Sequence, residues 1–254
     1  MKGKTMKRMC LILLAFLLLP GCGKQEIPTV ETAETVVTVQ TEAYVPVTEE
    51  TVTEETVTVP VTEPETVPTE PPVPESDEVL VRVLDYIPTA VQELRYATGN
   101  NFTGQVIYPF EDAYLRYGTV RKLKLVSEDL AELGLYIKIW DGFRPVSAQF
   151  TLWEVYPDPT YVANPNKGYS SHSRGNTIDL TLVDENGTEL EMPTGFDDFS
   201  AKADRNYSDC TESAANNAKI LESLMEKHGF NGYYGEWWHY SDTTSYQVNH
   251  VFEP

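Results

Sequence analysis

Residues 170–184 read SSHSRGNTIDLTLVD, a polar loop that runs directly into a strand pattern. Ile178, Leu180 and Leu182 alternate with polar residues there, so the apolar and polar sets face opposite sides of a strand. The DENG sequence that follows is typical of a turn. The stretch therefore predicts a strand that carries Asp179 on its polar face, directly after a loop that contains His172.

The segments around this stretch predict a mixture of helices and short strands. Apolar residues recur at helical intervals in 119–133 and 212–228, and a glycine follows each segment as a C-terminal cap. A shorter helix is predicted from Pro145, which suits a first helical turn, through residue 153. Strands are predicted over 135–140 and 230–240. Together these elements predict an α+β domain with a small, mainly antiparallel sheet and flanking helices.

Four polar residues of this domain could form a mononuclear zinc site. Catalytic zinc is typically held by three nitrogen or oxygen ligands, with a fourth position left open. His172 and Asp179 lie seven residues apart, and His239, in the sequence EWWHY (236–240), could supply the third ligand. Glu236 would then be free to act as general base on the water that zinc activates. Taken one at a time, each residue is also consistent with a turn, a strand surface or aromatic packing.

One feature of this pattern opposes a shared site. Glu236 and His239 are three residues apart, and in a regular strand such residues point to opposite faces. A bulge, a bend or the length of the glutamate side chain must bring both to one pocket. The zinc interpretation therefore depends on one of these three near the start of EWWHY.

Three sequence blocks resemble a known family. WDGFRP (140–145), SSHSRGNTIDLTL (170–182) and EWWHY (236–240) resemble, in the same order, the hallmark blocks of the D-alanyl-D-alanine dipeptidases of the VanX type, zinc peptidases related to the D,D-carboxypeptidases. Weaker similarity includes RYATGNNFTG (95–104) and the stretch from 187 to 197. The resemblance covers nearly all of residues 82–241.

The resemblance implies a role for each matching residue. It implies one zinc ion per domain, with His172, Asp179 and His239 as ligands, Glu236 as catalytic base and Arg144 near the scissile carbonyl. A fixed cation at that position would stabilise the tetrahedral oxyanion. For the substrate, the resemblance implies that Tyr96 and Asp197 hold the free ammonium and that Ser170 and Ser171 lie near the carboxylate.

The ammonium contact favours a dipeptide substrate, because an acylated amine would leave Asp197 buried and unpaired. The expected reaction is hydrolysis of D-Ala-D-Ala to two D-Ala. Two alternatives stay open: a D,D-carboxypeptidase that trims peptidoglycan stem peptides, and a non-catalytic module that binds cell-wall fragments. Intact Glu236 and Arg144 argue against the second, because a binding module does not need a base.

The beginning of the chain predicts export and a tether. Residues 1–22 combine a basic start, an apolar run and the sequence LPGC, which resembles the lipobox of bacterial lipoproteins. The expected lipid on Cys22 would attach the protein to the outer side of the cytoplasmic membrane, without a mature transmembrane helix. Residues 23–78 are rich in Thr, Glu, Val and Pro and predict a disordered, self-repelling stalk. The enzymatic domain is then expected over 79–254.

Charge excludes one class of partner. The chain has 39 acidic and 19 basic residues, for a net charge of −20, and residues 25–78 contain fourteen acids and no base. Binding to nucleic acid requires clustered Lys and Arg, so it is not expected.

Overall fold

The computed structural model describes residues 71–252 and 254, all of which belong to a unit that spans 63–254. The predicted export signal, the lipidation site Cys22 and stalk residues 23–70 lie outside the described residues. Within the described part, no helix has the length and apolar character that crossing a bilayer requires.

The main sheet has five strands in the order β2-β4-β5-β7-β6. β2 runs parallel to β4, whereas every other neighbouring pair is antiparallel. A separate antiparallel pair, β1-β3, was not predicted from the sequence. The strand bounds are β1 Leu80–Arg82, β2 Val91–Gln92, β3 Tyr114–Arg116, β4 Tyr136–Asp141, β5 Thr177–Val183, β6 Phe230–Tyr233 and β7 Glu236–Asp242.

Strand β5 lies at the centre of this sheet and is buried along its whole length. Its apolar face, formed by Ile178, Leu180 and Leu182, belongs to the hydrophobic core. Burying a leucine or isoleucine side chain contributes about 1.5–3 kcal/mol each. The polar face that the alternation predicted is also closed off from solvent, since Asp179 is only 3% exposed. A carboxylate in the middle of a buried sheet is costly unless it has charged or metal partners.

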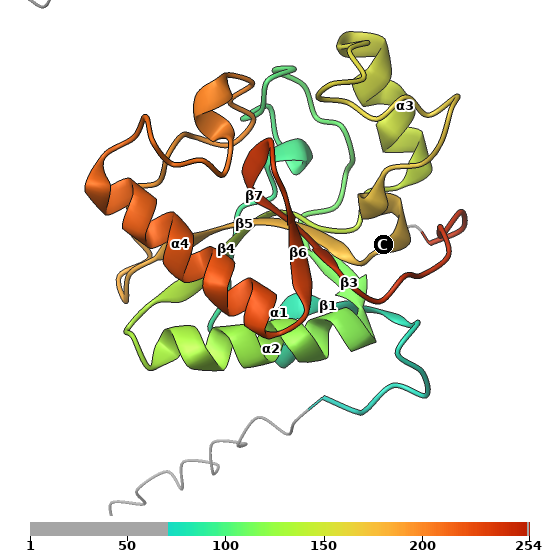
Figure 1. Cartoon of the computed structure of the whole chain (residues 1–254). Helices are drawn as coiled ribbons and strands as arrows, with labels where there is room; N and C mark the ends of the chain where they lie inside the picture. The colour runs from blue at the N-terminus through green and yellow to red at the C-terminus, as the bar shows by residue number, and fades with distance from the viewer. Residues whose placement is uncertain (1–70, 253) are drawn as a thin grey trace, which may run out of the picture. The chain divides into compact units, whose positions relative to one another are not determined.

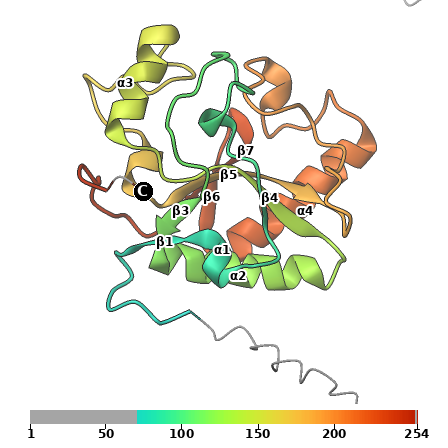
Figure 2. The same cartoon turned by 180° about the vertical axis from the view of Figure 1, so that it is seen from behind.

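The helices are α1 Val83–Tyr86, α2 Tyr117–Ala131, α3 Val146–Val155 and α4 Glu212–Lys227. The three longer helices lie where the sequence predicted them, with shifts of one or two residues at their ends. α2 and α4 cover one face of the sheet, and α3 lies with long loops on the opposite side (Figures 1 and 2). The fold class predicted from the sequence, α+β with a small, mainly antiparallel sheet, is confirmed.

The prediction of one strand over 230–240 is wrong. The segment forms a hairpin, in which β6 and β7 are joined by a turn at Tyr234 and Gly235. The register between the two strands shifts at Gly232 and Tyr233, which pairs with Glu236. This hairpin supplies the bend that the zinc interpretation allowed for.

Candidate active site

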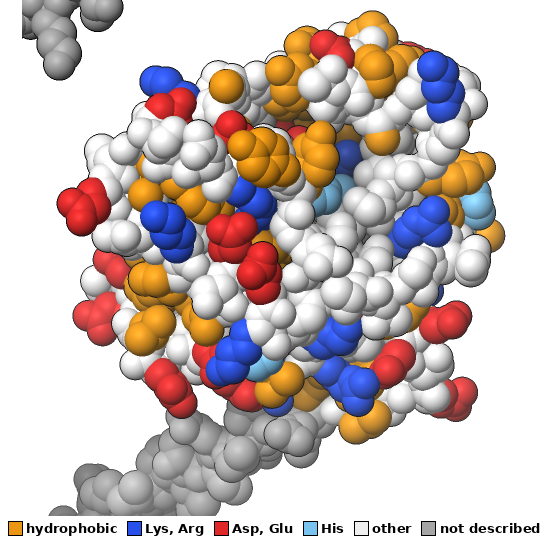
Figure 3. All heavy atoms as spheres, in the orientation of Figure 1, with side chains coloured by type: hydrophobic (Ala, Val, Ile, Leu, Met, Phe, Trp, Pro, Cys, Tyr) orange, Lys and Arg blue, Asp and Glu red, His pale blue; other side chains and the backbone are white. Residues whose placement is uncertain are grey.

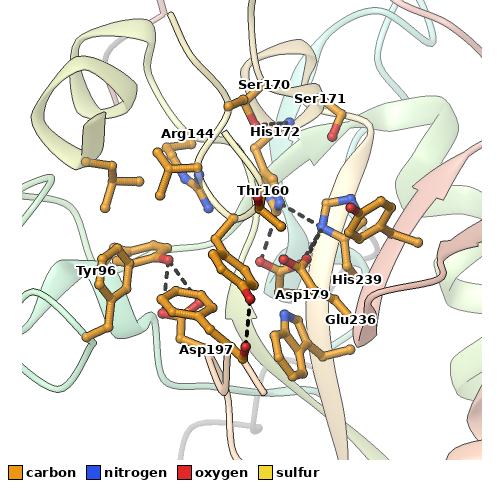
Figure 4. Close-up of a pocket in the computed structure, with 18 of the residues that line it drawn as sticks. Tyr96, Arg144, Thr160, Ser170, Ser171, His172, Asp179, Asp197, Glu236 and His239 are labelled. Carbon is orange, nitrogen blue, oxygen red and sulfur yellow. Dashed lines mark hydrogen bonds and ion pairs between the residues drawn. The ribbon is translucent and has the colours of Figure 1, made fainter. Parts of the chain in front are cut away.

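A cavity of about 260 Å³ opens on the side of the sheet away from α2 and α4. Figure 3 shows the surface hollowed here, with histidine side chains inside and hydrophobic side chains around the rim. A volume below the roughly 300–1,000 Å³ of drug-sized ligand sites suits a very small ligand. All nine enzymatic residues singled out from the sequence line this cavity: Tyr96, Arg144, Ser170, Ser171, His172, Asp179, Asp197, Glu236 and His239 (Figure 4).

His172, Asp179 and His239 converge at the bottom of the cavity. Each offers one possible ligand atom, and these atoms all lie within 4.8 Å of one another. His172 Nε2 is 3.4 Å from Asp179 Oδ2, and His239 Nδ1 is 3.0 Å from Asp179 Oδ1. The structure thus brings together residues separated by 67 positions along the chain.

Secondary structure explains this convergence. Asp179 on β5 and His239 on β7 are direct partners in the antiparallel register, so their side chains emerge next to each other on one face. His172 lies in a short 3-10 helix, η2 (Ser171–Arg174), just before β5. Gly175 ends η2 in the left-handed conformation, with φ of 74°, which returns the chain to the sheet within two residues.

The donors in this cluster fit a divalent metal such as zinc. Asp179 Oδ1 is buried and makes no well-aligned hydrogen bond within the described residues, although His239 Nδ1, itself a possible metal ligand, lies 3.0 Å from it. The His172 ring is oriented by Nδ1, 2.8 Å from the carbonyl oxygen of Gly142, so that Nδ1 can donate there and Nε2 is left for a ligand. Burial alone would raise the pKa of Asp179, but the two imidazoles hold it well below its usual range. The carboxylate is therefore ionised and available as a ligand.

Glu236 lies at the first position of β7, beside this cluster. Its Oε2 is 3.5 Å from His239 Nδ1, so the two side chains that a regular strand would separate reach the same cavity. The β6-β7 turn makes this possible, because Glu236 pairs out of register with Tyr233. Burial raises the pKa of Glu236 to about 7, although the nearby His239 opposes the shift. A carboxylate with a pKa near neutrality is suited to accept and return a proton.

Arg144 is held rigidly at another wall of the cavity. Its Nε donates to Asp141 Oδ2 at 3.0 Å, and Nη1 donates to Gln149 Oε1 at 3.0 Å. The guanidinium also lies over the Tyr96 ring, 4.8 Å from its centroid. Burial alone would lower the pKa of Arg144, but the Asp141 carboxylate raises it above its ordinary value. Arg144 is therefore a permanent, preorganised cation in the cavity.

Tyr96 and Asp197 form a second pair, away from the metal cluster. The Tyr96 hydroxyl donates to both carboxylate oxygens of Asp197, at 3.0 and 3.2 Å. Asp197 adopts a left-handed backbone conformation, with φ of 57°, that few residues other than glycine or Asn/Asp adopt. Burial, followed by the charge of Asp179, raises the pKa of Asp197 well above its usual range. Among the described residues Asp197 forms no ion pair, although the charge of Arg144 partly opposes the rise in its pKa; a substrate ammonium would supply a paired cation.

The two serines have different surroundings. The Ser170 hydroxyl accepts a hydrogen bond from the backbone N–H of His172 at 3.3 Å and caps η2. This contact gives Ser170 a role in shaping the loop. Ser171 is partly exposed and lines the cavity without a side-chain hydrogen bond within the described residues.

Two of the residues that support this cavity, Tyr108 and Gln149, were not indicated by the sequence. Asp141, which frames Arg144 in the WDGFRP block, accepts from Arg144, and the Tyr108 hydroxyl donates to Asp141 at 2.7 Å. Gln149 accepts from Arg144 and donates to the carbonyl of Ala163, in the loop that walls the cavity. Tyr108 and Gln149 lie outside the three sequence blocks, and no pattern in the sequence indicates either of them.

Comparisons with known proteins place the chain in a family. The peptidase M15 family model, described as D-ala-D-ala dipeptidase, matches residues 77–253. The chain is 38% identical over 162 residues to the D-alanyl-D-alanine dipeptidase of Escherichia coli K12, which covers 63% of this chain and 83% of the relative. It is 34% identical over 168 residues to the D-alanyl-D-alanine dipeptidase of Enterococcus faecalis V583, covering 58% and 83%. A solved structure of the vancomycin-resistance D,D-pentapeptidase VanY with Zn(II) aligns at 15% identity and a TM-score of 0.35, covering 54% of this chain and 77% of that one.

Proposed function

Because the chain belongs to the peptidase M15 family of D-Ala-D-Ala dipeptidases, we propose that it hydrolyses the dipeptide D-Ala-D-Ala to two D-Ala in a zinc-dependent reaction. The observation that carries the proposal is the convergence of His172, Asp179 and His239, with Glu236 3.5 Å from one of them. When bound by these three residues, zinc would supply a Lewis acid that polarises the peptide carbonyl and lowers the pKa of water.

Glu236 performs the proton transfers in this proposal. Its carboxylate accepts a proton from the attacking water as the new C–O bond forms. It then returns the proton to the nitrogen of the second D-Ala as the C–N bond breaks. The near-neutral pKa of Glu236 supports both steps, because neither protonation state is strongly disfavoured.

Arg144 stabilises the oxyanion that develops on the carbonyl oxygen. Its guanidinium is buried and held by Asp141 and Gln149, so little reorganisation is needed when negative charge develops. A preorganised donor of this kind is worth about 3–4 kcal/mol of barrier.

Asp197 favours the dipeptidase over the stem-trimming carboxypeptidase. A free ammonium at the position of the Asp197 carboxylate would complete the pair that Tyr96 begins. An N-acylated substrate offers an amide there and leaves the carboxyl group without a cation, which costs affinity. The cavity of about 260 Å³ also favours the smaller substrate.

We place the reaction on the outer side of the cytoplasmic membrane. This part of the proposal rests on the sequence alone: the signal-like residues 1–22, the lipobox-like LPGC that ends at Cys22, and the acidic segment that follows. At that location, a role in recovering D-Ala from wall fragments is more consistent with this chain than glycopeptide resistance.

The test is an assay of D-Ala release by the full domain loaded with zinc. We expect cleavage of D-Ala-D-Ala, loss of activity with a chelator, and recovery when zinc is returned. N-acetyl-D-Ala-D-Ala, tested in parallel, should be cleaved at least about tenfold less efficiently. Preference for the acetylated substrate would support the carboxypeptidase instead, and zinc binding without any hydrolysis would support a binding module.

A further inference from the structure

Arg205 has no part in the sequence-based site, but its side chain lies beneath the hairpin that carries two of the site residues. It follows the short 3-10 helix η3 (Ala201–Ala203), and its side chain is only 6% exposed. A buried arginine has five N–H donors to satisfy, so the groups it bonds indicate what it holds in place.

Most of these donors bond backbone carbonyls of the β6-β7 hairpin. The two N–H groups of Nη2 are shared among the carbonyl oxygens of Glu236, Trp237 and His239, at 3.3, 3.1 and 2.9 Å. Nε donates to the carbonyl of Tyr233 at 2.9 Å. One guanidinium thus bonds the backbone of both Glu236 and His239 and of the residue on the other side of the turn.

The guanidinium has a closely fitting place within the fold. A Cβ atom on Gly232 would lie 2.2 Å from Arg205 Cζ, so glycine leaves the space that the guanidinium fills. On its other edge, Nη1 donates to the Tyr240 hydroxyl at 3.0 Å and to Glu222 at 3.1 Å. The cation also lies over the Tyr240 ring, 4.3 Å from its centroid. These contacts fix the planar group in one orientation.

This position coincides with the irregular part of the hairpin. The register shift at Gly232 and Tyr233 disrupts the regular ladder where Glu236 must turn toward His239. Backbone carbonyls at such an irregularity need partners from outside the ladder. Arg205 supplies them.

We propose that Arg205 is a positioning residue, which holds the backbone of the β6-β7 hairpin so that Glu236 and His239 face the same substrate. The inference rests on the proposed function for its catalytic consequence. Its structural part is that one guanidinium places both a base and a metal ligand. Zinc titration and hydrogen exchange test this part, and neither depends on enzymatic activity.

A second cation that contacts strand β7 offers a matched control. Lys122 forms an ion pair with Asp242 at the far end of β7 and bonds Thr244 at 3.0 Å. Lys122→Met therefore removes a cation that anchors the same strand, but away from the cavity. It should lower stability and leave kcat within about twofold.

The principal variants are Arg205→Met and Arg205→Lys. With a base misplaced by about 1 Å, we expect kcat on D-Ala-D-Ala to fall about 100-fold in Arg205→Met, with KM within about threefold. Zinc affinity, measured by metal titration, should fall about 10-fold or more because His239 loses its support. Arg205→Lys keeps the charge but not the planar fork, so it should recover only part of kcat. Hydrogen exchange in the metal-free protein should increase at amides 233–240.

A double variant separates positioning from a general loss of stability. If Arg205 affects the rate through Glu236, then Arg205→Met, compared at equal zinc content, should lower the residual rate of Glu236→Gln by less than about threefold. Should Arg205→Met fail to fold, Gly232→Ala provides the same test, since its methyl group displaces the guanidinium.

The inference is overturned if Arg205→Met lowers the melting temperature but retains wild-type kcat, zinc affinity and exchange at 233–240. An additive effect in the Glu236→Gln background also contradicts it. If the wild-type protein cleaves no D-Ala peptide, the proposed function fails, whereas zinc affinity and hydrogen exchange still decide the role of Arg205.

Discussion

Replacing Asp197 with asparagine tests how the cavity distinguishes a free amine from an acylated one. The substitution preserves shape and can still accept from Tyr96, whose hydroxyl bonds both carboxylate oxygens at 3.0 and 3.2 Å. It removes the negative charge and replaces one of the two acceptor oxygens with an NH2 donor. A hydrogen bond to a charged partner contributes about 1.5–3 kcal/mol, which corresponds to roughly 10- to 150-fold in kcat/KM. We expect a loss of this size for D-Ala-D-Ala.

N-acetyl-D-Ala-D-Ala should respond differently, because its amide cannot pair with the carboxylate. We expect its kcat/KM to stay within about threefold in Asp197→Asn or to rise, since the variant removes an uncompensated partly buried charge. The assay is D-Ala release from both substrates by wild type and variant at equal zinc content. Equal losses on the two substrates, or no loss on either, would refute the assignment of Asp197 to the ammonium.

The same variant has a pH-dependent effect on stability. Burial, followed by the charge of Asp179, raises the pKa of Asp197 well above its ordinary value. The stability that the protonated carboxyl contributes is complete below about pH 4 and is lost as pH rises through the folded-state pKa. Asparagine does not ionise, so the melting temperature of Asp197→Asn relative to wild type should increase from pH 4 toward alkaline pH. A constant difference across that range would contradict the raised pKa.

Three further predictions concern the base, the metal and the loop. Glu236→Gln should lower kcat by about 100-fold or more with zinc retained, because an amide cannot accept the proton. Metal analysis and turnover measurements check this prediction. Full turnover would exclude Glu236 as the base. Chelation should lower the melting temperature and zinc should restore it, because zinc binds only the folded cluster; an unchanged melting temperature would contradict a metal site there. Gly175→Ala places a Cβ atom 2.5 Å from Leu80 Cδ2 on a residue whose φ is 74°. The free energy of unfolding, measured by denaturation, should therefore decrease by about 1–2 kcal/mol.

The sequence by itself pointed to nine residues that line one cavity and to most of the elements that surround them. Periodic patterns located α2, α4, β4 and β5 to within a few residues, because such patterns depend on local burial. The three sequence blocks contain His172, Asp179 and Glu236 in a spacing that resembles one family, and the family is now shown. These features lie within short segments, so no knowledge of distant contacts was needed.

Only the tertiary structure decided how these residues meet. The register between β5 and β7 makes Asp179 and His239 direct partners, and the β6-β7 turn brings Glu236 to the same side. Arg205 fits beneath that turn because Gly232 leaves room for it. Strand register, a reversal within an aromatic segment and a buried guanidinium depend on contacts between residues far apart in the chain, which local propensity does not encode.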